Sequence, residues 1–241
     1  MKEMKRNLII AAVAGVAVLA LIGAGGYTYF FSGLRTSPDT LGLSSATPSA
    51  TAGSTSATNL TGKWNIASGS LVGYRVQELF AGASSKHLAV ARTSDVSGSL
   101  AISGDASGYT VSGITLTANL TSLHSVDQVA GRNVSQRDGV VTRQLAVQQF
   151  PSATFTATSA SVPGSLYSAQ VDVSAPGKLT IHGVTKDVTA LAKAQVVGDK
   201  VEIAGTLTIN MTDYGVSPPQ APFVTVDPTA TIEFDIFLTK A

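Results

Sequence analysis

The chain of 241 residues contains no cysteine. Disulfide bonds, thiolate metal sites and cysteine nucleophiles are therefore excluded, and so is the acyl anchor of a bacterial lipoprotein. The absence does not place the protein in the cytosol, because many exported bacterial proteins also lack cysteine.

Charged residues are scarce as well, at 13% of the chain with a formal net charge of +1. The sequence has no cluster of basic residues that could bind the phosphates of nucleic acid, so we expect no nucleic-acid partner. Glycine, serine, threonine, valine and alanine dominate instead, a composition that favours an all-β domain.

Catalytic and cofactor motifs are missing too. The three histidines, His87, His124 and His182, stand alone in the sequence without metal-ligand spacing or neighbouring carboxylate clusters. There is no G-x-S-x-G elbow, P-loop or Rossmann glycine pattern. We therefore expect neither an enzyme nor a metal or cofactor site.

The longest hydrophobic run lies at the N-terminus. Lys2, Lys5 and Arg6 precede an apolar stretch from Leu8 to Phe31, which is longer than the roughly 20 residues that cross a bilayer. Residues 1–31 are predicted to form a basic tip and one transmembrane helix, with the N-terminus cytoplasmic and the rest extracytoplasmic. A cleaved signal peptide is the alternative.

Residues 32–60 are rich in serine, threonine, alanine, glycine and proline, with Arg35 and Asp39 as the only charges. Such a segment cannot bury enough apolar surface to offset its chain entropy. It is predicted to be a flexible linker with an average reach of roughly 30 Å.

Residues 61–241 show the period-2 alternation of half-buried strands, and Trp64 is expected to plug the core at the first of them. Between residues 127 and 149 the period changes to that of a helix, which Phe150 and Pro151 end. About eight antiparallel strands with one helix near the middle predict a closed β-barrel, because closure removes exposed strand edges. The predicted strands cover residues 70–77, 95–102, 109–123, 153–159, 169–173, 179–182, 188–196, 200–211 and 230–240.

Several short motifs follow one another over residues 62–240. They are Gly62-Lys63-Trp64, Tyr74-Arg75-Val76, residues 93–98, Arg137-Asp138, residues 150–155, residues 178–188 and residues 212–216. In their order and spacing these motifs resemble the YceI-like family of exported lipid-binding proteins. The resemblance implies an antiparallel, lipocalin-like β-barrel that is capped by a helical insertion and holds a long apolar cavity for an isoprenoid or another amphiphile. It also implies a protein that is not an enzyme, because members of the family are not generally known as enzymes.

Inward positions of the predicted strands are mainly aliphatic, and an eight-stranded barrel can just hold one slim ligand. We expect a membrane-tethered carrier or sensor of an isoprenoid-like or other amphiphilic lipid, in an oligomeric state that the sequence leaves open. The alternative is a structural or adhesive surface module with a filled core. The residues predicted to line the lipid cavity are Val72, Tyr74, Val76, Leu100, Ile114, Leu116, Leu145, Phe155, Leu207, Ile209, Phe234 and Ile236.

Two further expectations concern the ends of the barrel. Residues 80–90 are predicted to form a flexible loop that borders an opening. His182 lies out of phase with the buried Leu179 and Ile181 and is expected on the outer surface.

Overall fold

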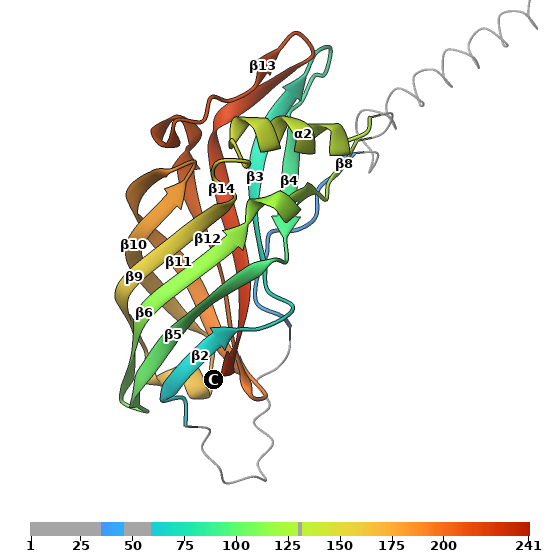
Figure 1. The fold of residues 1–241 in the computed structure, drawn as a ribbon. Helices are drawn as coiled ribbons and strands as arrows, with labels where there is room; N and C mark the ends of the chain where they lie inside the picture. Colours follow the sequence, from blue (N-terminus) through green and yellow to red (C-terminus); the bar gives the residue numbers. More distant parts are fainter. Residues whose placement is uncertain (1–34, 46–58, 130–131) are drawn as a thin grey trace, which may run out of the picture.

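A computed structural model describes residues 35–45, 59–129 and 132–241, which form a β-barrel with a short helix across one end (Figure 1). The strands are β1 (Arg35–Thr36), β2 (Gly62–Ile66), β3 (Leu71–Phe80), β4 (His87–Thr93), β5 (Val96–Asp105), β6 (Gly108–Asn119), β7 (His124–Ser125), β8 (Gln128–Val129), β9 (Ser152–Val162), β10 (Val171–Ile181), β11 (Val184–Val197), β12 (Lys200–Asn210), β13 (Gln220–Ala221) and β14 (Val224–Lys240). The helix α2 spans Ser135–Gln144, and 3-10 turns cover Leu120–Ser122, Gly164–Tyr167 and Met211–Tyr214.

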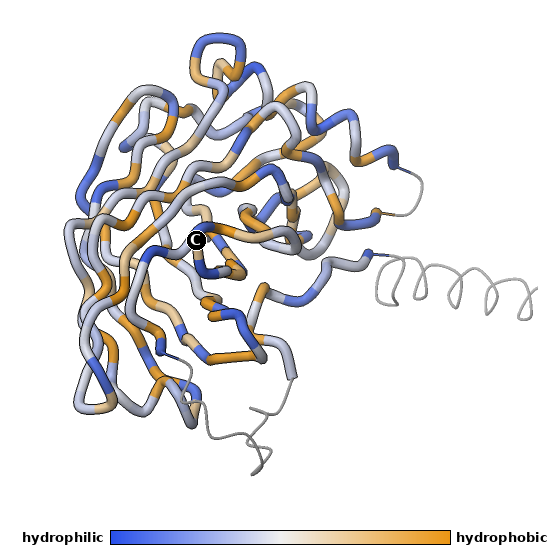
Figure 2. Tube along the Cα trace, turned by 60° about the horizontal axis from the view of Figure 1, so that its bottom comes forward, coloured by the Kyte–Doolittle hydropathy of each residue, from blue (hydrophilic) through white to orange (hydrophobic). Residues whose placement is uncertain are grey.

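The ring closes where β12 pairs with β14, for example at Ile203 opposite Ile236. Eight antiparallel strands complete it in the order β12, β11, β10, β9, β6, β5, β2 and β14, as the alternation predicts. Strands β3 and β4 extend the wall along the other edge of β14. Hydrophobic and hydrophilic positions alternate along the strands around the ring (Figure 2).

One end of the barrel is packed shut and forms its floor. Trp64 is 1% exposed there, and its indole N–H donates to the Leu60 carbonyl at 2.8 Å. Leu60, Leu166 and Leu238 pack in the same core cluster. The prediction that Trp64 is part of the core is confirmed. Because this end is closed, a ligand can reach the interior only from the opposite end of the barrel.

Helix α2 is shorter than the predicted 127–149. Asp127 is buried against the wall and Gln128–Val129 pair with β1, so the chain enters the helix only at Ser135. Turns follow Gln144 up to Phe150. Asp138 in the first turn and Arg143 in the last complement the helix dipole.

The strand near residues 169–173 is not separate, because it runs without a break into the next as β10. His182 also differs from the expectation: it lies in the β10–β11 turn with φ 53°, not on the outer face of a strand. Its ring packs edge-on against Phe150 with centroids 5.2 Å apart, and its Nδ1 lies 3.1 Å from the Tyr214 carbonyl oxygen. The alternation of inward and outward side chains does not apply to His182, because this residue belongs to a turn and not to a strand.

The predicted loop at residues 80–90 is partly wrong as well. Strand β4 begins at His87 and pairs with β3 from Glu78 to Val72, so only the residues between Phe80 and His87 form the connection. Phe80 does border the opening described below.

Residues 35–45, within the predicted flexible linker, lie along the outside of the barrel, and we call this segment the strap. Its β1 pairs with β8, and its backbone N–H groups at Leu41 and Ser44 donate to the carboxylates of Glu233 and Glu202 at 3.1 and 2.6 Å. Under the strap, Glu202 and Glu233 are fully buried although they point outward from the barrel.

The predicted transmembrane helix lies outside the described residues. Within the described part of the chain, no helix has the length and apolar character needed to span a membrane.

Candidate functional site

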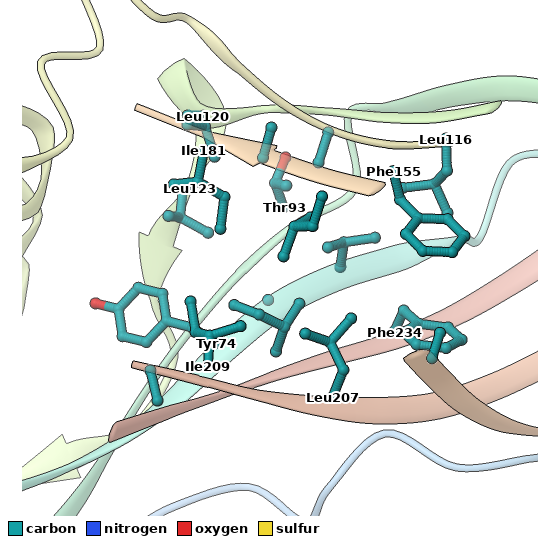
Figure 3. Close-up of a pocket in the computed structure, with 18 of the residues that line it drawn as sticks. Tyr74, Thr93, Leu116, Leu120, Leu123, Phe155, Ile181, Leu207, Ile209 and Phe234 are labelled. Atoms are coloured by element: carbon teal, nitrogen blue, oxygen red, sulfur yellow. The ribbon is translucent and has the colours of Figure 1, made fainter. Parts of the chain in front are cut away.

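A cavity of about 810 Å³ occupies the barrel interior, lined mainly by apolar side chains from the strands (Figure 3). This volume lies in the upper part of the range of about 300–1,000 Å³ that is usual for ligand pockets. The interior is therefore not the filled core that the structural or adhesive alternative predicts.

All of the residues predicted to line the lipid cavity are in its wall, and their contact with a lipid remains a prediction. They come from β3, β5, β6, β9, β12 and β14, with one from the turn that follows α2. The set is Val72, Tyr74, Val76, Leu100, Ile114, Leu116, Leu145, Phe155, Leu207, Ile209, Phe234 and Ile236.

The cavity stays open because one side of its wall carries small side chains. The inward positions of β11 are alanines at 190, 192 and 194, and Ala175 of β10 lies opposite Ala190 across the strand pair. A methyl group fills far less of the interior than leucine or phenylalanine at the same position. Phe155, Leu207 and Phe234 line the cavity on other strands (Figure 3).

The mouth lies at the end covered by α2. Arg132, Asn133 and Gln136 at the start of the helix region are exposed and also line the cavity. Phe223, beside β13, is 61% exposed and lines it too. Residues that face both water and the cavity mark where a ligand can enter.

Helix α2 is tied to the barrel wall by Arg137. Its guanidinium contacts Asp127 at 2.7 Å and Glu78 at 2.5 Å. Asp127 also accepts from the Val90 backbone N–H at 3.0 Å and lies 2.7 Å from His87 Nε2. We call these four side chains, Glu78, His87, Asp127 and Arg137, the lid cluster.

The surroundings of Asp127 and Arg137 in the lid cluster keep both side chains charged. Burial alone would raise the pKa of Asp127, but hydrogen bonds from His87 and Arg137 outweigh it and hold this pKa well below its usual range. Burial would lower the pKa of Arg137, but the hydrogen bond to Asp127 and the charge of Glu78 raise it above its usual value. These ion pairs therefore hold helix α2 in place at the mouth of the cavity.

The prediction that His87 stands alone is thus wrong. Its ring nitrogen and the carboxylates of Glu78 and Asp127 lie within 4.8 Å of one another, a grouping with metal-ligating atoms. Arg137 already bridges both carboxylates, so the cluster is built as an ion-pair network. No local spacing could have revealed it, because Glu78 and His87 lie about forty residues or more before Asp127 and Arg137 in the chain.

Two tyrosine side chains bring hydroxyl groups to the wall of the mainly apolar cavity. Tyr74 reaches past Ile209 with its hydroxyl at one end of the lining group in Figure 3, and burial raises its pKa. Tyr214 is 2% exposed, lines the cavity, and its hydroxyl has no hydrogen-bond partner in the described chain. Burial and the nearby charge of Asp213 raise the pKa of Tyr214. These hydroxyls can each donate to a polar group of a bound amphiphile.

Solved structures include one of similar fold. It is described as "Structure of a polyisoprenoid binding domain from Saccharophagus degradans implicated in plant cell wall breakdown". The match has a TM-score of 0.50 at 16% sequence identity and covers 75% of this chain and 99% of that one.

Among curated proteins, a UPF0312 protein of Pseudomonas putida is 35% identical over 95 residues, which is 37% of this chain and 47% of the relative. A second one, from strain W619, is 32% identical over the same length. The aligned part thus spans about half the length of these relatives. The YceI-like domain model matches residues 64–238, nearly the whole barrel. The chain therefore belongs to the YceI-like domain family.

Proposed function

We propose that the protein binds an isoprenoid-like or other amphiphilic lipid in the barrel cavity, as a carrier or sensor outside the cytoplasmic membrane, tethered by its N-terminal apolar segment. The observation that carries the proposal is the open apolar cavity of about 810 Å³ with hydroxyls of Tyr74 and Tyr214 in its wall. The structure of similar fold is described as that of a polyisoprenoid binding domain, which supports this cargo class.

The cavity can supply enough binding free energy for such a cargo. Each CH₂ group removed from water contributes about 0.8 kcal/mol, so a chain of roughly ten carbons gains about 8 kcal/mol before entropic losses. Those losses take a substantial part, so affinity depends on how well the chain fills the cavity. The ion pairs of the lid cluster hold helix α2 in place at the mouth, which suits a binding role.

Extraction of the purified full chain with organic solvent, followed by mass spectrometry, tests the proposal. We expect a stoichiometric lipid from the wild-type protein. Ala192→Phe, which places a ring inside the cavity, should lose most of that lipid. Leu191→Phe is the matched control, because Leu191 is 62% exposed on the outer face of the same strand. Absence of lipid from the wild type, or equal lipid in both variants, would contradict the proposed function.

A further inference from the structure

Two neighbouring hairpins at the mouth carry an exposed apolar patch. Phe223 is 61% exposed and Leu79 is 37% exposed, and the Ala81 backbone N–H donates to the Phe223 carbonyl at 3.0 Å. Together with Phe80 and Pro222 these residues form what we call the rim patch. The β3–β4 and β13–β14 hairpins that carry it extend beyond α2 at the mouth end of the barrel (Figure 1).

Basic side chains flank the rim patch. Arg132 is exposed, with its guanidinium carbon 4.2 Å from the centre of the Phe80 ring. Lys86 is half-exposed and pairs with Asp227, and Arg35 contacts the Ser85 carbonyl. Exposed aromatic and aliphatic groups beside basic ones suit the interface of a bilayer that contains anionic lipids.

The mouth end of the barrel is also the end that lies closest, along the chain, to the N-terminal apolar run. The strap begins at the mouth, where Arg35 pairs with Val129 and the Ser37 hydroxyl donates to the Leu88 carbonyl. The apolar run ends at Phe31, only four residues before Arg35. Four residues span at most about 14 Å, less than half of the reach predicted for a linker up to residue 60. A bilayer that holds the apolar run therefore lies near the mouth and not near the floor.

We propose that the rim patch docks on the surface of the bilayer, so that the mouth of the cavity opens against the lipid phase. A hydrophobic cargo can then pass between bilayer and cavity without crossing water, which would cost about 0.8 kcal/mol for each exposed CH₂ group. This inference rests on the proposed function for its cargo and for the tether in the bilayer. The orientation of the barrel on the bilayer follows from the rim patch, its charges and the strap.

Lipid-phase quenching of single introduced tryptophans tests the docking. The full chain is reconstituted into vesicles of phosphatidylcholine and phosphatidylglycerol that contain a brominated lipid. Phe223→Trp reports the rim, Leu191→Trp the side wall and Tyr167→Trp the floor end, all at exposed positions. The wild-type chain corrects for the buried Trp64. We expect quenching of most of the added emission in F223W and little in L191W or Y167W.

Equal quenching at all three positions, or strongest quenching in Y167W, would overturn the docking. A second readout is the transfer of a fluorescent isoprenoid to acceptor vesicles. Leu79→Ser removes rim apolarity at a residue outside the cavity wall, and we expect loading to stay unchanged and transfer to slow by about threefold to tenfold. An unchanged transfer rate in L79S would also count against the docking.

The two proposals can fail separately. Lipid in the extract without rim quenching refutes the docking alone, and rim quenching without lipid in the extract refutes the lipid cargo alone.

Discussion

Arg137 offers the sharpest test of how the helix over the mouth is held. Its side chain is 14% exposed, and it neutralises two carboxylates, Glu78 and Asp127, whose side chains are 4% and 0% exposed. Arg137→Met keeps most of the hydrophobic stem but leaves both carboxylates buried without their main counter-charge. Breaking a buried ion pair in this way costs about 3–5 kcal/mol.

The cost should depend on pH in a defined direction. The pKa of Asp127 is lowered in the folded wild type, so its contribution to stability is present above the unfolded value near 4 and is lost as the pH falls below it. In R137M the Asp127 carboxylate loses its stabilisation by Arg137 and its pKa rises, so protonation of Asp127 offsets part of the destabilisation at low pH. The difference between the two proteins should therefore be largest near neutral pH and shrink as the pH falls below about 5.

Guanidinium unfolding followed by the fluorescence of Trp64, the sole tryptophan, measures the free energy of unfolding. Arg143→Met is the matched control, because Arg143 is an exposed arginine on the same helix, and we expect a change within about 0.5 kcal/mol. A loss below about 1 kcal/mol for R137M at neutral pH, or a loss that does not vary with pH, would refute the role assigned to the lid cluster.

Two further predictions concern the barrel wall. Burial and the charge of Glu202 raise the pKa of Asp235 to about 6, so folded protein binds the proton more tightly and stability falls as the pH rises from about 4 to about 6. Asp235→Asn should therefore be more stable than the wild type by roughly 1–3 kcal/mol at pH 7 and equal to it near pH 4. A denaturation series over that pH range that shows no gain in stability at pH 7 would contradict a raised pKa of Asp235. Gly98 has φ 146°, and a Cβ there would lie 2.0 Å from the Thr115 carbonyl oxygen. Gly98→Ala should therefore lower the melting temperature clearly. Gly108→Ala is the control and should leave the melting temperature nearly unchanged, because a Cβ at Gly108 meets no atom within 4 Å. Similar melting temperatures for the two glycine variants would show that the β5–β6 contact can relax.

Strand alternation carried the sequence-based prediction of the fold. Because side chains alternate between the two faces of a strand, Val72, Tyr74 and Val76 had to share one face, and closing the barrel turned that face inward. The small residues at 190, 192 and 194 of β11 leave room in the interior, but the pattern alone could not decide between a cavity and a filled core.

The contacts that the pattern missed join residues far apart in the chain. His87 and Asp127 are forty positions apart, and nothing in their immediate neighbourhood indicates that they meet. The strap was missed for a different reason. Glu202 and Glu233 occupy outward positions, where a charge normally meets solvent, and a sequence pattern does not distinguish an outward charge in water from one covered by another segment.

The strap also bears on where this domain begins. The family match starts at residue 64, and a recombinant fragment cut there would expose Glu202, Glu233 and Gln195, which residues 41–44 now cover. It would also remove the carbonyls of Pro38 and Asp39 that accept from Arg75 and Arg92. Residues 35–45 therefore stabilise the barrel from outside the shared family domain, and a truncation meant to yield the bare barrel would yield a less stable protein that exposes these buried polar and charged side chains on its flank.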